Sequence, residues 1–407
     1  MSEQTFQVVI VGAGSAGIST ASSLLKRNPS VSIALIEPSE DHYYQPGWTM
    51  VGGGIFDAQS THRKTAELIP SQATWIQNSV VTFDPENNKV FLSDGTSVSY
   101  EQLVVAPGLK LNWAGVAGLE DALGKNGVTS NYRYDLASYT WELVQNMKGG
   151  KAIFTQPGMP IKCAGAPQKA LYLSGSEWLD QGVLADIDIE FYNAGGVLFG
   201  VPEYVPALQS YIDKYGAQVK YMHNLVKIDG ESKTAWFTNA NDESDDLVET
   251  KFDFIHVCPP QCSLDFIRDS VLSDDAGWLD VDPSSLQHKQ YANIWGAGDV
   301  TNTTNAKTMA ATRKQAPVVA QNISNALKSI APSSSYDGYG SCPLTVEKGK
   351  IVLAEFCYGG KVTPTFPAWL NDGTKPTRFA WMLKANILPS IYWKAMLKGR
   401  EWLASPK

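Results

Sequence analysis

The chain has 407 residues, of which 43% are hydrophobic and 18% are charged, and its formal net charge is -8. This length is too great for one simple core and predicts two or three domains. The negative charge argues against a nucleic-acid-binding protein, because such a protein needs a concentrated basic face.

The N-terminal residues, MSEQTFQVVIVGAG, enter a strand-like run at once. We therefore expect neither a signal peptide nor a transit peptide. No uncharged apolar segment approaches the roughly 18 residues that span a bilayer. The cysteines are few and far apart, unlike a secreted disulfide framework, so any pair is expected to be redox-active. They are Cys163, Cys258, Cys262, Cys342 and Cys357.

Residues 6–36 read as strand, turn, helix and strand, a βαβ unit of the size that binds a dinucleotide. The turn, GAGSAG, has the GxGxxG pattern that lets the backbone and the helix N-terminus approach a pyrophosphate. An acid at the end of the second strand can accept hydrogen bonds from a ribose hydroxyl. The pattern predicts a dinucleotide site that contains Gly12, Gly14, Ser15, Ala16, Gly17 and Glu37.

Residues 151–200 read as a second βαβ unit, with KAIFTQP and DIDIEFYN as strands around the helical segment APQKALYLSGSEWLDQGV. Relatives that use NAD(P)H carry a second GxGxxG turn in this unit. Here the turn is TQPGMPIKCAGAP, which contains Pro157, Pro160 and Cys163 but no GxGxxG. We expect the fold to be kept and the NAD(P)H site to be lost.

Cys163 precedes a helix whose first turn is expected to contain Pro167, a favoured position for proline. A thiol at a helix N-terminus, next to the charge of Lys162, is in a setting that lowers its pKa. Cys163 is therefore a candidate nucleophile toward a flavin or a disulfide. The alternative is a small buried hydrophobic residue, which is what most lone cysteines are.

Residues 291–327 read as a strand that ends in GAGD and a long helix. The aspartate can bond a ribityl hydroxyl, and the helix can point its positive end at an isoalloxazine ring. Together with the first GxGxxG, this pattern predicts FAD. The segment VVAPGLKLN is expected to link the two domains. Pro46 is expected either to pack against the flavin or to belong to the core. Lys307 is expected either to hold a flavin oxygen or to be exposed. The remaining FAD candidates are Pro107, Gly108, Gly298 and Asp299.

Residues 376–407 carry Lys or Arg at 378, 384, 394, 398, 400 and 407 against the single acid Glu401. Tryptophans interleave with Met and Leu, and Pro389 is expected to divide two short helices. Basic amphipathic helices that carry Trp are typical of a membrane interface. The alternative is a helical pair docked on the core with a solvated basic edge.

Four runs carry a closer resemblance: EPSEDHYYQPGWTMVGGG, SNYRYD, AIFTQPGMPIKCAGAPQKALYLS and YDGYGSCPL. They resemble the sulfide:quinone oxidoreductase family, in its mitochondrial-type branch. The resemblance implies an FAD enzyme that oxidises sulfide with Cys163 near the flavin and Cys342 as the carrier of the persulfide. It also implies that a quinone takes the electrons and that a small nucleophile such as glutathione, coenzyme A or sulfite takes the sulfur.

The resemblance further implies peripheral attachment, at the cytoplasmic side of a bacterial inner membrane or at the mitochondrial inner membrane. By position, the quinone pocket is expected to contain Phe366, Trp369, Phe379 and Lys384. We do not expect the protein to bind nucleic acid. The oligomeric state stays open, with a homodimer among the alternatives.

The expected fold is α/β, with two Rossmann-like domains in tandem and C-terminal amphipathic helices. Residues 1–112 and 280–330 are assigned to the FAD-binding domain, 113–279 to the second domain, and 331–407 to a quinone and membrane-interface region. The histidines lack paired-ligand spacing, so no metal site is expected. Cys258 and Cys357 are assigned to packing, and the role of Cys262 stays open.

Three other functions stay open. A type-two NADH:quinone oxidoreductase would share the fold, the FAD and the membrane helices, but it would need a second GxGxxG. A sulfide dehydrogenase flavoprotein that donates to a cytochrome would be exported and would lack the basic tail. A persulfide carrier or an FAD-stabilised interaction protein would keep the nucleotide motifs without turnover.

Overall fold

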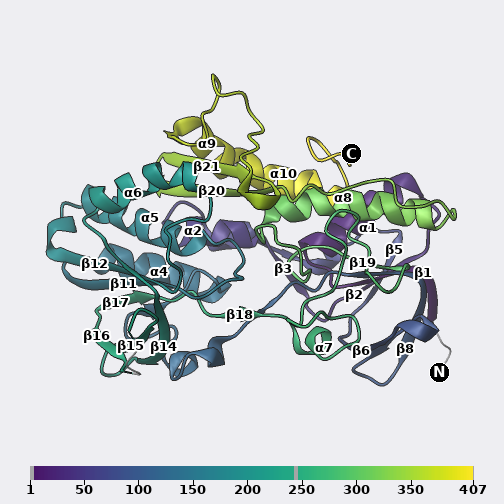
Figure 1. Ribbon diagram of the computed structural model, residues 1–407, viewed down its shortest axis with the longest axis horizontal. Coiled ribbons are helices and arrows are strands. Elements are labelled where there is room, and N and C mark those ends of the chain that lie inside the picture. Colours follow the sequence, from purple (N-terminus) through teal and green to yellow (C-terminus); the bar gives the residue numbers. More distant parts are fainter. Residues whose placement is uncertain (1–3, 243–245, 407) are drawn as a thin grey trace.

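The computed structural model describes residues 4–242 and 246–406, so the outer ends of the expected domain ranges, residues 1 and 407, lie outside it. Two mainly parallel α/β units lie side by side, and a C-terminal layer packs across both (Figure 1). This arrangement confirms the expected tandem of Rossmann-like units. The active-site elements come from all three parts.

The first sheet has the strand order β5-β2-β1-β8-β7-β6. β8 is flanked by β1, and its other edge pairs with β7 at one end and with β19 at the other. The run VVIV in β1 is buried, as expected for a strand covered on both faces. The strands are β1 (Gln4–Val11), β2 (Ile33–Ile36), β5 (Ala73–Ile76), β6 (Val80–Asp84), β7 (Lys89–Leu92), β8 (Ser97–Val105) and β19 (Ile294–Gly296).

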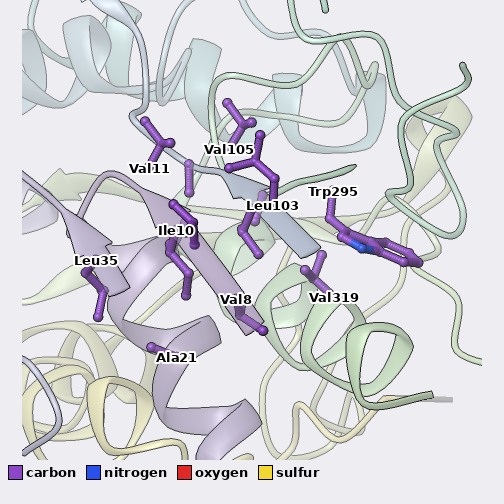
Figure 2. Packing of buried hydrophobic residues seen from close by; sticks show 14 of the residues in the cluster. Val8, Ile10, Val11, Ala21, Leu35, Leu103, Val105, Trp295 and Val319 are labelled. Carbon is purple, nitrogen blue, oxygen red and sulfur yellow. The ribbon is translucent and has the colours of Figure 1, made fainter. Parts of the chain in front are cut away.

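Helices α1 (Ser15–Arg27) and α8 (Met309–Ala326) pack against each other on one face of this sheet. Figure 2 shows Val8 and Ile10 of β1 facing Ala21 of α1 and Val319 of α8. Residues far apart in the sequence therefore share one core. Because β19 and α8 complete the unit that β1 and α1 begin, the GAGSAG and GAGD turns lie at the same edge of the sheet.

The second sheet is parallel throughout, with the order β10-β17-β11-β12-β13. Its elements are β10 (Val128–Thr129), α4 (Tyr134–Asn146), β11 (Gly150–Gln156), α5 (Ala166–Asp180), β12 (Ile187–Asn193), α6 (Val205–Lys214), β13 (Gln218–Tyr221) and β17 (Phe254–His256). An antiparallel sheet of β14 (His223–Asp229), β15 (Thr234–Asn239) and β16 (Val248–Lys251) adjoins it.

Short elements fill the region around the two units. They are β3 (Asp41–Tyr43) paired with β4 (His62–Lys64), α2 (Trp48–Val51), β9 (Lys110–Leu111) paired with β18 (Gln261–Cys262), α3 (Leu119–Ala122) and α7 (Asp265–Arg268).

The C-terminal layer begins with the antiparallel strands β20 (Gly340–Glu347), β21 (Lys350–Phe356) and β22 (Pro376–Thr377). β20 packs on both α5 and α8, so it bridges the two units (Figure 1). This packing brings the GSCPL run of β20 to the beginning of α5, which sequence patterns alone did not place.

The expectation that Pro389 divides two helices is wrong. α9 (Arg378–Met382), the π-helical turn η9 (Leu383–Ile387) and α10 (Leu388–Lys394) run on without a break. A proline inside an α-helix clashes with the carbonyl four residues earlier, here that of Ala385. Ala385 lies in η9, where the wider turn relieves this clash.

The segment after α10 docks on α1. Ser22 Oγ donates to the Leu397 carbonyl at 2.8 Å, and Arg27 pairs with Glu401 at 2.5 Å. These bonds hold the segment after α10 against α1, while the Trp402 and Leu403 side chains are at least half exposed. Within residues 4–242 and 246–406, no helix is both long enough and apolar enough to cross a membrane.

Candidate active site

A cavity of about 350 Å³ lies where the three parts of the molecule meet. The GAGSAG turn, the 106–108 link and the GAGD turn line one end. Residues of the IKCAGAPQK segment, among them Lys162, Cys163 and Lys169, line the middle. The other end is formed by β20, β21 and η9, and α10 reaches back to the GAGSAG turn through the contact of Tyr392 with Ser15. The cavity therefore joins the predicted dinucleotide site to the C-terminal helices.

The three glycines of GAGSAG meet three different requirements. Gly12 has φ +95°, and a Cβ there would lie 2.6 Å from the Ala106 carbonyl oxygen. A Cβ on Gly17 would lie 1.9 Å from the Gly12 carbonyl oxygen, so α1 packs directly on the turn. Around a Cβ on Gly14, no atom of the described residues other than its chain neighbours would lie within 4 Å, which leaves room for a ligand. A tight turn, an open approach and close helix packing are what a bound pyrophosphate requires.

Glu37 is fixed at the end of β2. Its Oε2 accepts from the Ala13 backbone N–H at 3.0 Å, and its Oε1 accepts from Ser39 N–H at 2.9 Å. The carboxylate therefore lies against the glycine turn, as a ribose-binding acid should. Ser15 and Ala16 line the cavity beside it. These residues fit the adenosine and pyrophosphate part of FAD.

The GAGD turn is held from inside by Lys307. Its Nζ donates to the carbonyls of Asp299 at 2.8 Å and Thr301 at 2.7 Å. Lys307 is buried rather than exposed, and burial lowers its pKa to about 8. Gly298 donates to Gln315 at 2.8 Å, and Asp299 lines the cavity. Pro46, Pro107 and Gly108 also line it.

Cys163 has an unusual backbone. Its φ of +52° lies in the left-handed region, where a non-glycine residue is strained. Its N–H donates to the Lys307 carbonyl at 2.8 Å, and its own carbonyl accepts from Ala166 N–H at 2.7 Å. Pro167 lies in the first turn of α5, as expected. The backbone bonds therefore hold the thiol in place between α5 and the GAGD turn.

Cys342 reaches Cys163 because Gly165 lets β20 approach α5. A Cβ on Gly165 would lie 2.3 Å from Leu344 Cδ2 and 4.0 Å from Cys342 Cβ. The two cysteine side chains are hydrogen-bonded to each other. Cys342 is fully buried, whereas Cys163 is half-buried and lines the cavity.

The charge next to Cys163 comes from Lys169 and not from Lys162. Lys169 Nζ lies 3.0 Å from Cys163 Sγ, whereas Lys162 Nζ donates to Gln45 Oε1 at 2.5 Å. The hydrogen bond from Cys342, followed by the charge of Lys169, holds the pKa of Cys163 well below that of an ordinary thiol. The same hydrogen bond and burial raise the pKa of Cys342.

Lys384 projects from η9 into the cavity and donates to the Pro46 carbonyl at 2.8 Å. Burial, followed by the charge of Lys169, lowers its pKa to about 7. Phe366 lines the same end, with its ring centroid 5.1 Å from that of Phe379 behind it. The expectation that Trp369 lines the pocket is wrong, because its side chain is 85% exposed. Trp369 follows Pro367 in a loop whose residues 367–370 are exposed.

The comparisons with known proteins agree with this geometry. A family described as pyridine nucleotide-disulphide oxidoreductase matches residues 6–141. The mitochondrial sulfide:quinone oxidoreductase of Dictyostelium discoideum is 42% identical over 397 residues, which are 97% of this chain and 86% of that protein. The chain belongs to the sulfide:quinone oxidoreductase family.

Solved structures extend the likeness to the fold. The sulfide:quinone oxidoreductase of Aquifex aeolicus has a TM-score of 0.79 at 20% identity, and the match covers 98% of this chain and 92% of that one. A chain in the mitochondrial ATP synthase of Tetrahymena thermophila has a TM-score of 0.85, also at 20% identity, with 97% and 96% covered. The fold is therefore shared with a chain found in a different kind of assembly.

Several residues around this oxidoreductase site were not predicted. Lys169 had a local signal, since it is a lysine on the otherwise buried helix α5. Tyr392 bonds Ser15 and His42, and Glu355 lines the cavity from β21. Neither had a local signal, because their partners lie far away in the sequence or on another element.

Cys258 belongs to a small hydrophobic cluster against which Cys163 also packs. Cys258 is buried, and burial raises its pKa to about 12. Cys262 pairs with Lys110 across β18 and β9. Across the described residues, no three His, Cys, Asp or Glu side chains are grouped so that they could hold a metal ion.

Proposed function

We propose that this chain oxidises sulfide with Cys163 and Cys342 and passes the electrons to a quinone, with FAD as its cofactor. The observation that carries the proposal is the Cys342–Cys163–Lys169 contact at the wall of a cavity that also contains a dinucleotide-binding turn. FAD, when bound, accepts two electrons from the sulfur chemistry and gives them to the quinone. Family membership and the fit of Gly12, Gly14 and Gly17 to a pyrophosphate support this cofactor.

The sulfur steps balance as follows. In the oxidised pair, hydrosulfide attacks Cys342 Sγ, the Cys163–Cys342 bond breaks, and Cys163 leaves as a thiolate. Cys342 then carries a persulfide, and a thiol-type acceptor removes its outer sulfur. Loss of two electrons remakes the disulfide, and the quinone takes these electrons with two protons. The sum is H₂S + RSH + quinone → RSSH + quinol.

The pKa difference supports the assignment of roles within the pair. In thiol–disulfide exchange, the nucleophile preferentially attacks one sulfur of the disulfide so that the other leaves as the more stable thiolate. Lys169 stabilises the thiolate of Cys163, whereas burial and the bond to Cys163 disfavour ionisation of Cys342. Sulfide is therefore expected to add to Cys342. Glutathione, coenzyme A and sulfite remain the candidate acceptors, and a panel of them with quinone reduction as readout decides between them.

We also propose that the C-terminal layer attaches peripherally to a membrane, from which the quinone enters. Leu383, Leu388 and Ile391 give this end of the cavity an apolar wall. Trp402 and Leu403 line the cavity and are 59% and 50% exposed, and Trp369 and Met382 of the C-terminal layer are exposed as well. Lys394 and Lys398 of this layer are also exposed, and exposed Trp together with exposed Lys is typical of a bilayer interface.

Vesicle flotation tests this attachment. Trp402→Glu and Trp369→Glu should release the protein from vesicles that contain anionic lipid. Val271→Glu is the matched control, because Val271 is 61% exposed but follows α7, on the side of the molecule opposite α10 (Figure 1). If all variants bound the vesicles as well as wild type does, the proposed membrane attachment would be contradicted. The membrane is the mitochondrial inner membrane or the inner face of a bacterial inner membrane, and fractionation of the source cell distinguishes them.

The two sheets support the proposed division into a domain of residues 1–112 and 280–330, a domain of 113–279, and a C-terminal region of 331–407. The two sheets have separate hydrophobic clusters, but Ile267, Leu272 and Leu279, which the division assigns to the second domain, pack in the cluster of the first sheet. The chain is therefore expected to return to the first domain before Ile267. Mild proteolysis followed by mass spectrometry should place early cuts near these boundaries. Early cuts within the sheets would contradict the division.

The activity is tested anaerobically with purified protein, sulfide and a soluble quinone. Wild type should bleach its flavin with sulfide and reduce the quinone. Cys163→Ser and Cys342→Ser should each abolish bleaching by sulfide while FAD stays bound, whereas Cys262→Ser should behave as wild type. Faster bleaching by NADH than by sulfide would favour the NADH:quinone oxidoreductase alternative. Absence of quinone reduction would leave the non-enzymatic alternative.

A further inference from the structure

Glu355 is a buried carboxylate that the sulfur chemistry does not use. It belongs to β21, is 4% exposed, and lines the cavity at the end where Phe366 and Lys384 lie. Among the residues that the structure describes, no Lys, Arg or His nitrogen lies within 4.0 Å of its oxygens. A carboxyl group placed in this way needs a reason, because burial of an acid without a cation is unfavourable.

The hydrogen bonds of Glu355 lead from the cavity to the surface. Its Oε1 accepts from the Tyr339 hydroxyl and from Thr365 Oγ1, both at 2.5 Å, and its Oε2 accepts from Thr365 N–H at 3.1 Å. Thr365 is exposed. Water can therefore reach the Thr365 hydroxyl, which in turn touches a carboxylate that faces the cavity.

Other groups complete the surroundings of the carboxylate. Tyr204 bonds the backbone of Glu355 rather than its side chain. Arg313 and Lys314 of α8 face Tyr339, with Lys314 Nζ 5.5 Å from the ring centroid. Lys384 lies on the same cavity. These cations act on Tyr339 and on the cavity, and the direct donors to the Glu355 oxygens are hydroxyl and amide groups.

We propose that Glu355 is the group that protonates the quinone as it is reduced, and that the Thr365 hydroxyl refills it from solvent. This inference rests on the proposed function. Conversion of a quinone to a quinol takes up two electrons and two protons. Sulfide oxidation supplies the electrons, and each proton passes from Glu355 to a quinone oxygen. The carboxylate then takes the hydroxyl proton of Thr365, which water replaces, and two such cycles complete one quinol.

The experiment separates the two halves of the reaction. Enzyme reduced with dithionite is mixed anaerobically with a soluble quinone, and flavin absorbance is followed over a pH series. Glu355→Gln should slow this reoxidation by about tenfold or more and flatten its pH profile. Its bleaching by sulfide should keep the wild-type rate. Added formate should restore reoxidation in Glu355→Gln, because a small acid can replace the missing proton donor.

Thr365→Val should slow reoxidation and raise its solvent isotope effect, whereas Thr363→Val should not. Thr363 is the matched control, since it lies in the same loop and its hydroxyl bonds the Lys361 carbonyl instead. A quinone analogue should bind Glu355→Gln with unchanged affinity. An infrared carboxylic-acid band that shifts in D₂O should accompany reoxidation in wild type and be absent from Glu355→Gln.

The outcomes distinguish the inference from the function on which it rests. If wild type does not reduce quinone, the proposed function fails. If wild type reduces quinone and Glu355→Gln matches it in rate and pH profile, the inference is overturned. If Glu355→Gln slows both half-reactions alike and formate restores neither, Glu355 only supports the fold around Tyr339 and Thr365, which also overturns the inference.

Discussion

The Tyr392 hydroxyl of α10 lies 2.7 Å from Ser15 Oγ, so the C-terminal helix touches the dinucleotide-binding turn. The same hydroxyl lies 2.5 Å from His42 Nε2, and His42 Nδ1 lies 3.2 Å from the Ala13 carbonyl. Tyr392 and His42 are both buried. Burial lowers the pKa of His42 to about 4, so the imidazole stays neutral at physiological pH. Hydrogen bonds between uncharged groups of Tyr392, His42 and Ser15 therefore support the GAGSAG turn.

Tyr392→Phe should weaken FAD binding. Loss of the hydroxyl leaves Ser15 and His42 without a buried partner, which costs about 1–3 kcal/mol. If most of this energy supports the bound form of the turn, FAD affinity falls by about tenfold. Titration of apoprotein with FAD, followed by flavin fluorescence, measures the change. Tyr291→Phe, on the half-buried edge of the same domain, is the control, and equal affinities in the two variants would contradict the prediction.

Lys169→Ala should raise the pKa of Cys163, because the variant removes the charge 3.0 Å from its sulfur. At fixed neutral pH the thiolate fraction then falls, and alkylation of Cys163 in the reduced protein should slow by about tenfold. Peptide mass spectrometry resolves Cys163 from the other cysteines. Lys162→Ala should alkylate at the wild-type rate. If Lys162→Ala slowed the alkylation of Cys163 more than Lys169→Ala did, Lys162 would be the residue that lowers the pKa of Cys163.

Gly165→Ala should separate the two cysteines without emptying the FAD site. The new methyl would lie 2.3 Å from Leu344 Cδ2, so the Leu344 side chain, or β20 with it, must shift, at a cost of roughly 1–3 kcal/mol. Bleaching by sulfide should fall while FAD stays bound. Leu344→Ala opens the space again, so the double variant should bleach faster than Gly165→Ala alone. Additive effects in this double-mutant cycle would show that the contact is not the cause.

Lys384 gives the stability a pH dependence with a definite sign. Burial lowers its pKa from 10.5 to about 7, so between these values the unfolded chain binds a proton that the folded chain does not. Stability therefore rises with pH in this window, and the full penalty of the buried ammonium is present below it. Lys384→Met removes this dependence.

The stability gained by Lys384→Met over wild type should therefore shrink by on the order of 4 kcal/mol from about pH 7 to 10.5. Denaturant unfolding at a series of pH values measures it. Lys394 is exposed, so Lys394→Met should give a curve of stability against pH that is parallel to that of wild type. A parallel curve for Lys384→Met as well would mean that the buried lysine is not desolvated as described.

Local patterns predicted much of this molecule. The βαβ units were predictable because strand, turn and helix signals lie within about thirty residues of each other. The glycine turn, Glu37 and Pro167 followed from the same short-range rules. The family resemblance added Cys342, which no local rule connects to Cys163.

The wrong and missing parts depend on contacts between distant segments. Lys162 is adjacent to Cys163 in sequence, yet Lys169 reaches the sulfur because one helical turn brings it back over the N-terminus of α5. The partner of Tyr392 lies 377 positions away. Trp369 was expected inside from its position in the chain, but exposure of single apolar side chains is common and is decided by packing.

The close contact between Gly165 and Leu344 also bears on how this protein could change over evolutionary time. In a pyridine-nucleotide enzyme the space in front of this helix would have to admit a pyrophosphate, but here the Leu344 side chain lies in it. A return to nicotinamide chemistry would need β20 to retreat, the left-handed Cys163 to be replaced and Lys169 to lose its partner, all together. Each change alone would disturb the Cys163–Cys342 pair without creating a nicotinamide site. Specialisation for sulfur is thus protected against reversal by single substitutions.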